Sequence, residues 1–409
     1  MRGTRVLATL GPIAVSGALV AIAGLVPVQY PSERPVVSVT PVLGVTCPFT
    51  GSGGQLVVAG QEPRVRALSG KAVDASAPVT SPLAISLTGS RTPAAGIAST
   101  QGGALLWTEC GTPTSSGSIL IPNPATAEVV LANSDRLDAL VNITLSGPDG
   151  PVRAAGLVDI QVPAGQVVKV PMSVHAPADT PLEVFWTASQ GRVQASGQQI
   201  GEGREQAPST QPDEVLAFAA VLGGQQRTRL VLHNPGPERA EVSISALGER
   251  GRFTPETDLA SLEPGTTVVH DLTQPLAGQH TGLLVESTAP VTGLVEVQTG
   301  TDVGWVTPTR PGTRLGDVVP RGTLQLVNPN AVPARVVVRQ AGAETAVTIP
   351  AGGVQRVPVQ AGEVSVTSNM AIAAGAQMAG TGIGLTRLRA LPAAEKAQSG
   401  TLDPHLGQE

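Results

Sequence analysis

The stretch Leu230-Val-Leu-His-Asn-Pro235 decides the fold, because it returns along the chain as Leu324-Gln-Leu-Val-Asn-Pro329. A weaker third copy reads Val129-Val-Leu-Ala-Asn-Ser134. In each copy the alternating apolar residues predict a short strand with one buried face. The Asn at its end predicts a turn, because an Asn side chain can bond its own backbone. Self-similarity of this kind predicts several related structural units.

Further repeated motifs follow each Asn. A Pro-Ala-Gly or Pro-Gly sequence predicts a tight turn, since glycine readily adopts a positive φ. Two more strands are then expected, one ending in Ser and the next in Gln. A degenerate fourth copy is expected at the front, because Pro93–Gln101 matches Pro290–Gln298 and Trp107 has an equivalent in Trp305. The equivalent positions are Gly165, Gly265 and Gly352, then Ser189, Ser287 and Ser368, then Gln198, Gln298 and Gln377.

Short alternating strands with frequent turn signals predict an all-β chain of tandem antiparallel, immunoglobulin-like β-sandwich units. A β-propeller-like arrangement is the alternative, although blades of about 40–50 residues are shorter than these units. The units are expected to form a rigid rod, with an exposed loop over Glu202–Gln211. The predicted segments are 1–29, a signal anchor or signal peptide; 30–44, a stalk; 45–122, a degenerate disulfide-containing unit; 123–205, 213–310 and 314–391, three sandwich units; and 392–409, a disordered tail.

The N-terminus indicates export. Arg2 and Arg5 precede the apolar stretch Val6–Val28, which is about long enough to span a ~30 Å hydrocarbon layer as one transmembrane helix. The basic residues predict a cytoplasmic N-terminus and an extracytoplasmic bulk. Ala21-Ile-Ala23 leaves a secreted product open, released by cleavage after Ala23. Both alternatives export the rest of the chain.

Two cysteines, Cys47 and Cys110, lie in the first exported segment. In an oxidising compartment such a pair predicts one disulfide. The rival interpretation is a metal site, but no histidine occurs before His175. We therefore expect the disulfide.

Composition excludes some partners. The net charge is −5, which argues against a broad basic surface for nucleic acid. Aromatic residues are only 2% of the chain, so few side chains are available as sugar platforms. Trp107 and Trp305 are repeat equivalents and are expected in the core. A glycan partner stays possible on these grounds.

The histidines and serines form no catalytic or metal-binding pattern. His233 stands where its repeat equivalents are Ala132 and Val327, so a structural role is expected for it. His270-Asp271 and His280 form a local cluster without a further ligand at metal spacing. No Gly-x-Ser-x-Gly elbow occurs. The sequence thus predicts no catalytic, cofactor or metal residues, no cofactor, and no enzyme activity.

The predicted anchor, the Asn-Pro strand ends and the Pro-Ala-Gly turns resemble an actinobacterial secreted or membrane-anchored family known only as a domain of unknown function. The resemblance implies a cell-envelope location and an association with cell-surface biogenesis. We expect a non-catalytic, membrane-anchored scaffold that binds an envelope or membrane protein. A polysaccharide-binding module or carbohydrate-active enzyme is the alternative.

Overall fold

Strands dominate the structure. The computed structural model describes residues 42–391, apart from 52, 89–93, 177–179, 202–203, 222, 257–258 and 277. In this part the helical elements are two single 3-10 turns, η1 (Pro124–Thr126) and η2 (Met172–Val174). No helix among these residues has the length and apolar character needed to cross a membrane. The predicted anchor, most of the predicted stalk and the predicted tail lie outside the described residues.

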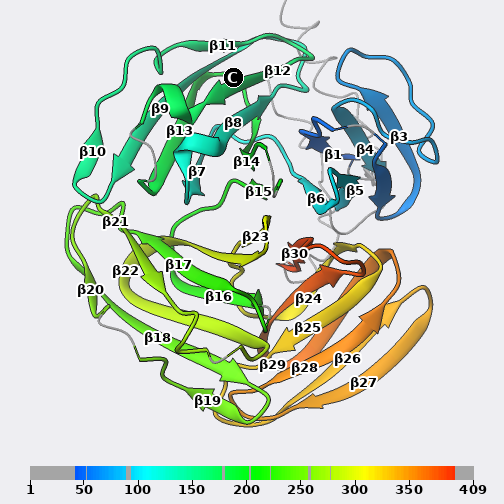
Figure 1. Ribbon diagram of the computed structural model, residues 1–409. Coiled ribbons are helices and arrows are strands. Elements are labelled where there is room, and N and C mark those ends of the chain that lie inside the picture. The colour runs from blue at the N-terminus through cyan, green and yellow to red at the C-terminus, as the bar shows by residue number, and fades with distance from the viewer. Residues whose placement is uncertain are drawn as a thin grey trace, which may run out of the picture. The chain divides into compact units, whose positions relative to one another are not determined.

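The all-β prediction is confirmed, and the strands of the described residues pair antiparallel. They form four successive β-sandwiches, which we call sandwich 1 to sandwich 4 (Figure 1). Sandwich 1 packs the sheet β1 (Val42–Cys47), β4 (Leu83–Thr88) and β3 (Gln61–Ala67) on the sheet β2 (Gln55–Val58), β5 (Ala95–Gln101) and β6 (Ala104–Cys110). Sandwich 2 packs β10 (Gly150–Val152), β11 (Ile160–Val162), β9 (Ala139–Gly147), β13 (Leu182–Gln190) and β7 (Ser116–Ile121) on β12 (Val167–Pro171), β8 (Ala127–Ala132), β14 (Gln194–Gln199) and β15 (Gln206–Pro208).

Sandwiches 3 and 4 each contain one long strand shared by both of their sheets. Sandwich 3 consists of β16 (Asp213–Val221), β17 (Arg227–His233), β18 (Ala240–Gly248), β19 (Gly251–Phe253), β20 (Ser261–Leu262), β21 (Thr267–Asp271), β22 (Thr281–Thr299) and β23 (Asp302–Val306). Sandwich 4 consists of β24 (Gly312–Val319), β25 (Gly322–Val327), β26 (Ala334–Gln340), β27 (Ala343–Ile349), β28 (Val354–Val359), β29 (Gly362–Met378), β30 (Leu385–Arg387) and β31 (Arg389–Ala390).

The long strands correct one prediction. Ser287 and Ser368 were expected to end strands, but β22 and β29 run straight through them into the second sheet. The break does occur in sandwich 2, where Gly191 adopts a φ of +74° between β13 and β14. Sandwiches 3 and 4 have no positive-φ residue at this point, so the backbone stays extended.

The repeated Asn explains the strongest sequence motif. Asn133, Asn234 and Asn328 are fully buried. The Nδ2 group of Asn234 donates to the carbonyls of Glu238, at 2.7 Å, and Leu262, at 3.1 Å. Its Oδ1 accepts from the amide of Gly236 at 2.9 Å. Asn133 and Asn328 bond the corresponding groups of their own sandwiches. Each Asn therefore clips the turn it starts to the strand before the Gly turn.

The four sandwiches close into a ring, by which we mean a circle of contacts that returns from sandwich 4 to sandwich 1. Each sandwich has its own apolar core. A separate apolar cluster joins each neighbouring pair. The clusters are centred on Leu68, Ala84 and Ala132 for pair 1–2; Leu120, Val231 and Trp305 for pair 2–3; Leu247, Val327 and Val354 for pair 3–4; and Trp107, Val318 and Met378 for pair 4–1.

The expected rod is therefore wrong. A rod would leave the apolar faces of sandwiches 1 and 4 in water, whereas the pair 4–1 cluster buries them. A closed circle is also the arrangement of the propeller-like alternative, but its members here are two-sheet sandwiches rather than single blades.

Candidate functional site

One short strand from each sandwich lines the middle of the ring. These inner strands are β6, β15, β23 and β30 (Figure 1). β6 contacts both β15 and β30, and β30 also contacts β23. The expectation of an exposed loop over Glu202–Gln211 is wrong for its second half. Gln206–Pro208 pairs with β14 as an inner strand, and Glu205 is only 1% exposed. A polar sequence can be buried here because its side chains find partners across the ring.

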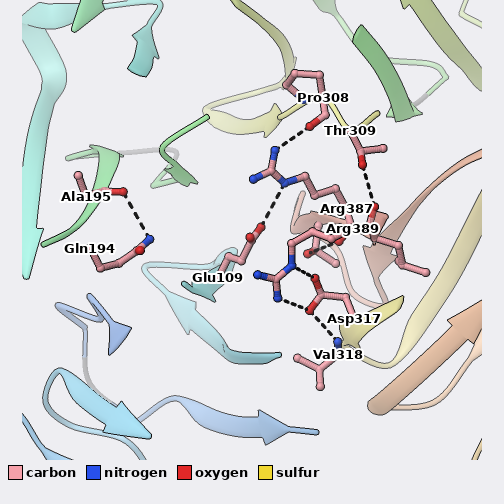
Figure 2. Close-up of polar contacts among 11 residues, drawn as sticks. Glu109, Gln194, Ala195, Pro308, Thr309, Asp317, Val318, Arg387 and Arg389 are labelled. Atoms are coloured by element: carbon pink, nitrogen blue, oxygen red, sulfur yellow. Dashed lines mark hydrogen bonds and ion pairs between the residues drawn. The ribbon is translucent and has the colours of Figure 1, made fainter. Parts of the chain in front are cut away.

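The first part of this network consists of ion pairs (Figure 2). Arg387 Nε of sandwich 4 lies 3.6 Å from Glu109 Oε2 of sandwich 1. The same guanidinium donates from Nη1 to the carbonyl of Pro308 at 2.7 Å. Arg389 Nε lies 2.6 Å from Asp317 Oδ2 within sandwich 4. These pairs place four buried or half-buried charges beside one another with no net charge.

The second part consists of neutral hydrogen bonds. Gln206 Oε1 accepts from Thr108 Oγ1 of sandwich 1 at 2.8 Å, and Gln206 Nε2 donates to Ser196 Oγ of sandwich 2 at 2.7 Å. Glu205 Oε2 accepts from the amide of Trp305 in sandwich 3 at 3.3 Å. We call these groups and the ion pairs the axial network. The Arg387–Glu109, Thr108–Gln206 and Trp305–Glu205 contacts cross sandwich boundaries and so help to hold the ring together.

Two hollows flank the Glu109–Arg387 pair. The inner hollow measures about 10 Å³, which is about the space for one water molecule. Trp107 and Trp305 line it, and the Nε1 groups of both have no hydrogen-bond partner among the described residues. The outer hollow is open and measures about 220 Å³. Its polar lining comes from Thr210, Gln211, Asp213, Thr309, Arg310, Arg387 and Arg389.

Burial raises the pKa of two axial carboxyl groups, those of Glu205 and Asp317. Burial raises the pKa of Glu205 well above its usual range, against the lowering effect of the Gln206 and Trp305 amides. Burial also raises the pKa of Asp317 to about 6, and the attraction of Arg389 opposes this. For Arg389, burial lowers the pKa, but the charges of Asp317 and Glu109 more than compensate. Burial therefore raises the pKa values of Glu205 and Asp317, while Arg389 stays charged.

The predicted disulfide between Cys47 and Cys110 is confirmed. It joins β1 to β6, and so fixes the inner strand of sandwich 1 to the opposite sheet. Trp107 and Trp305 are 2% and 3% exposed, as their predicted core positions require.

The histidines are dispersed. His233 is buried, with Nδ1 3.1 Å from Thr267 Oγ1, and burial lowers its pKa to about 4. His270 lies in β21, and His280 Nδ1 accepts from the amide of Gly223. Among the described residues, no three His, Cys, Asp or Glu side chains gather as a metal site would require. His405 lies outside them.

Sequence reasoning missed the axial network. Glu109, Glu205, Asp317, Arg387 and Arg389 belong to no repeated motif. One signal pointed toward the site: the equivalence of Trp107 and Trp305 places β6 and β23 at matching positions of their sandwiches. A search around the two tryptophans would have selected Glu109, but not the residues that pair with it.

These features define an all-β, disulfide-containing protein built as a ring of sandwiches around a polar axis. The chain belongs to the family of unknown function DUF5719, whose profile matches residues 69–359. The comparison with curated proteins found no match.

Two solved structures show a weak likeness. One is a Streptomyces avermitilis α-L-rhamnosidase complexed with L-rhamnose, with 10% identity and a TM-score of 0.15 over 86% of this chain and 55% of that chain. This chain thus corresponds to about half of the rhamnosidase. The other is a Ca²⁺-stabilized adhesin with which an Antarctic bacterium binds ice, with 12% identity and a TM-score of 0.12 over 87% and 95% of the two chains. At such TM-scores neither likeness bears on fold or function.

Proposed function

We propose that this protein is a non-catalytic scaffold of the cell envelope, anchored by its N-terminal segment, which holds a partner protein outside the cytoplasmic membrane. The observation that carries the proposal is the axial network. Three of its side chains, Arg387, Gln206 and Glu205, bond to groups of a neighbouring sandwich. Their role is to fix the four sandwiches in one arrangement, and a fixed arrangement suits a display platform.

The apolar surface supports a partner site on sandwich 2. Seven large apolar side chains are exposed among the described residues, and five of them belong to this sandwich. Leu137, Val158 and Val174 are each more than 70% exposed. The five residues are Leu137, Val158, Val174, Phe185 and Ile200. Exposed apolar side chains mark a contact surface where they act as one patch, so we propose that these five contact the partner together.

A cross-linked pull-down of the full-length protein from its native membrane tests the proposal. We expect one membrane or envelope protein to be recovered reproducibly. The doubly substituted Val158→Ser, Phe185→Ser protein should lose that partner, and Val332→Ser, which alters an exposed valine of sandwich 4, should retain it. Recovery of no protein by the unaltered chain would overturn the proposal.

The glycan alternative rests on the outer hollow. Its guanidinium, hydroxyl, amide and carboxylate groups are the kinds that bond sugar hydroxyls and acidic sugars. All three tryptophans are buried, so an exposed indole platform does not contribute. Titration of the protein with envelope polysaccharide fragments, followed by calorimetry, distinguishes the two. Saturable binding that Arg310→Ala abolishes would favour the glycan function.

A further inference from the structure

The outer edge of sandwich 4 differs from the other outer edges. β27 pairs with β26 alone among the described strands, and it lies at the rim in Figure 1. The pairing runs without a register shift from Gln340 opposite Ala343 to Ala334 opposite Ile349. The turn between them is Ala341-Gly342, with φ of +48° and +81°, as a two-residue type I′ hairpin requires.

The corresponding edges of the other sandwiches carry features that block strand addition. In sandwich 1, β3 contains Pro63 and a register shift. In sandwich 2 the edge is divided into β10, which contains Pro151, and β11. In sandwich 3 it is divided into the short strands β19 and β20. Proline, bulges and short length are among the usual protections of an edge strand, and β27 has none of these three; its one charged side chain, Glu344, is paired with Arg339.

β27 is exposed along one face and over the first half of the other, while Val347 and Ile349 turn toward the core of sandwich 4. Glu344, Ala346 and Thr348 lie on one face and are exposed. Ala343 and Thr345, on the opposite face, are exposed as well. A neighbouring strand could therefore lie alongside β27 without displacing any covering element.

The hairpin geometry determines which backbone groups point outward. In a two-residue hairpin the residues that flank the turn, here Gln340 and Ala343, form a hydrogen-bonded pair. Bonding alternates along the strand, so Thr345 and Val347 also bond to β26. The amides and carbonyls of Glu344, Ala346 and Thr348 then point away from the sheet.

We propose that β27 pairs antiparallel with β27 of a second copy of this chain, about a two-fold axis at Ala346. In this register Ala346 faces Ala346, and Glu344 of each copy faces Thr348 of the other. All three outward-pointing residues then exchange backbone hydrogen bonds. The two sheets become one continuous sheet, and the symmetry closes at a dimer.

Charge supports the second copy as the occupant. Arg339 faces Glu344 across the β26–β27 pair, with Nε 2.6 Å from Oε1, and Arg335 faces Thr348. In the row of side chains that crosses the interface on this face, Arg339 and Glu344 of one copy are followed by Thr348 and Arg335 of the other. Each Glu344 therefore lies between Arg339 of its own chain and Thr348 of the other copy, and Arg335 of the other copy is the next residue in the row. No like charges stand directly opposite each other, which would be destabilising.

Light scattering and chemical cross-linking of the full-length protein in mild detergent test this. We expect a dimer that dissociates on dilution. Ala346→Pro removes an outward N–H and should abolish the dimer peak, because proline is tolerated at an edge without loss of the fold. Ala346→Ser keeps that N–H and should retain the dimer. Circular dichroism checks that the proline variant stays folded.

A cysteine variant gives an independent readout. Hydrogen-bonded residues opposite each other lie about 5.5 Å apart between Cα atoms, within the range of a disulfide. Ala346→Cys should therefore form a disulfide-linked dimer under mild oxidation, whereas Val332→Cys, at an exposed loop of the same sandwich, should not. A protein that stays monomeric at high concentration, forms larger assemblies, or links through the introduced thiol to a different protein would overturn the proposal.

Discussion

Glu109 and Arg387 form the ion pair that joins the first sandwich to the last, with Arg387 Nε 3.6 Å from Glu109 Oε2. Both side chains are largely withdrawn from water, at 8% and 16% exposure. They lie on β6 and β30, the inner strands of sandwiches 1 and 4. The pair thus stands beside the apolar cluster of Trp107, Val318 and Met378 and supports the same closure.

Removing one member of this pair should destabilise the ring. Glu109→Gln leaves the Arg387 guanidinium buried without its counter-charge, and breaking a buried pair in this way costs about 3 kcal/mol. Urea unfolding measures the change in free energy of unfolding. The matched control is Glu241→Gln, which removes an exposed pair with Arg239 and should cost less than about 1 kcal/mol. Equal effects of the two substitutions would contradict a closing role for Glu109.

The disulfide should matter most to sandwich 1. Its core is small, and the cross-link between Cys47 and Cys110 spans a sequence separation of 63 residues. In the chain-entropy model a loop of this length stabilises by about 4 kcal/mol. We expect Cys47→Ala, Cys110→Ala to show a separate, lower melting transition by calorimetry. Added reductant should reproduce that transition in the unaltered protein and should change nothing in the double variant.

The sequence predicted the local elements better than their assembly. The Asn-Pro and Pro-Ala-Gly motifs are local, so they identified turns and strands that the structure contains, and Asn234 shows why the Asn recurs. β22 continues through Ser287 because no residue there has a positive φ, whereas Gly191 interrupts the equivalent strand of sandwich 2. Comparison of the repeats aligned the serines and did not reveal this difference. Ring closure depends on apolar surfaces that meet only in three dimensions, as Trp107 meets Val318. The pairing of Glu109 with Arg387 could not be predicted from the sequence for the same reason.

The Asn clip predicts a measurable asymmetry between two substitutions. Asn234→Ala removes a buried side chain that bonds two carbonyls and one amide, and should cost about 2–4 kcal/mol. Asn234→Asp keeps the acceptor for Gly236 but turns a carboxylate oxygen toward the carbonyls of Glu238 and Leu262. It should be at least as destabilising as the alanine. Denaturant unfolding of both variants tests this. If the Asn234→Asp variant were as stable as the unaltered protein, the hydrogen bonds donated by Nδ2 would contribute little to the free energy of unfolding.

The last prediction concerns Glu183, which is buried where sandwich 2 meets sandwich 3. Neither of its carboxyl oxygens has a hydrogen-bond partner among the described residues. Burial raises the pKa of Glu183 to about 8, and the nearby Thr292 hydroxyl, which does not reach hydrogen-bond geometry with the carboxyl group, opposes this. The folded protein therefore keeps a proton on Glu183 that the unfolded chain releases above about pH 4.5. Stability from this group is complete below pH 4.5 and falls until about pH 8, by up to about 1.4 kcal/mol per pH unit.

His233 opposes this trend at lower pH. Its pKa falls from 6.5 to about 4 on burial, so its contribution to stability rises with pH between those values. Above pH 6.5 the histidine no longer titrates, and Glu183 should dominate together with Glu205, whose pKa burial also raises. We therefore expect the melting temperature to fall between pH 6.5 and pH 8.

Glu183→Gln isolates the effect. The amide has the same shape and no charge to bury, so the variant should match the unaltered protein near pH 5 and exceed its melting temperature by several degrees at pH 8. The control Glu256→Gln changes an exposed glutamate and should leave the pH dependence as it is. Glu205 remains in the Glu183→Gln variant, so the fall should shrink rather than vanish. An unchanged pH dependence would mean that Glu183 ionises in the folded protein at its ordinary pKa.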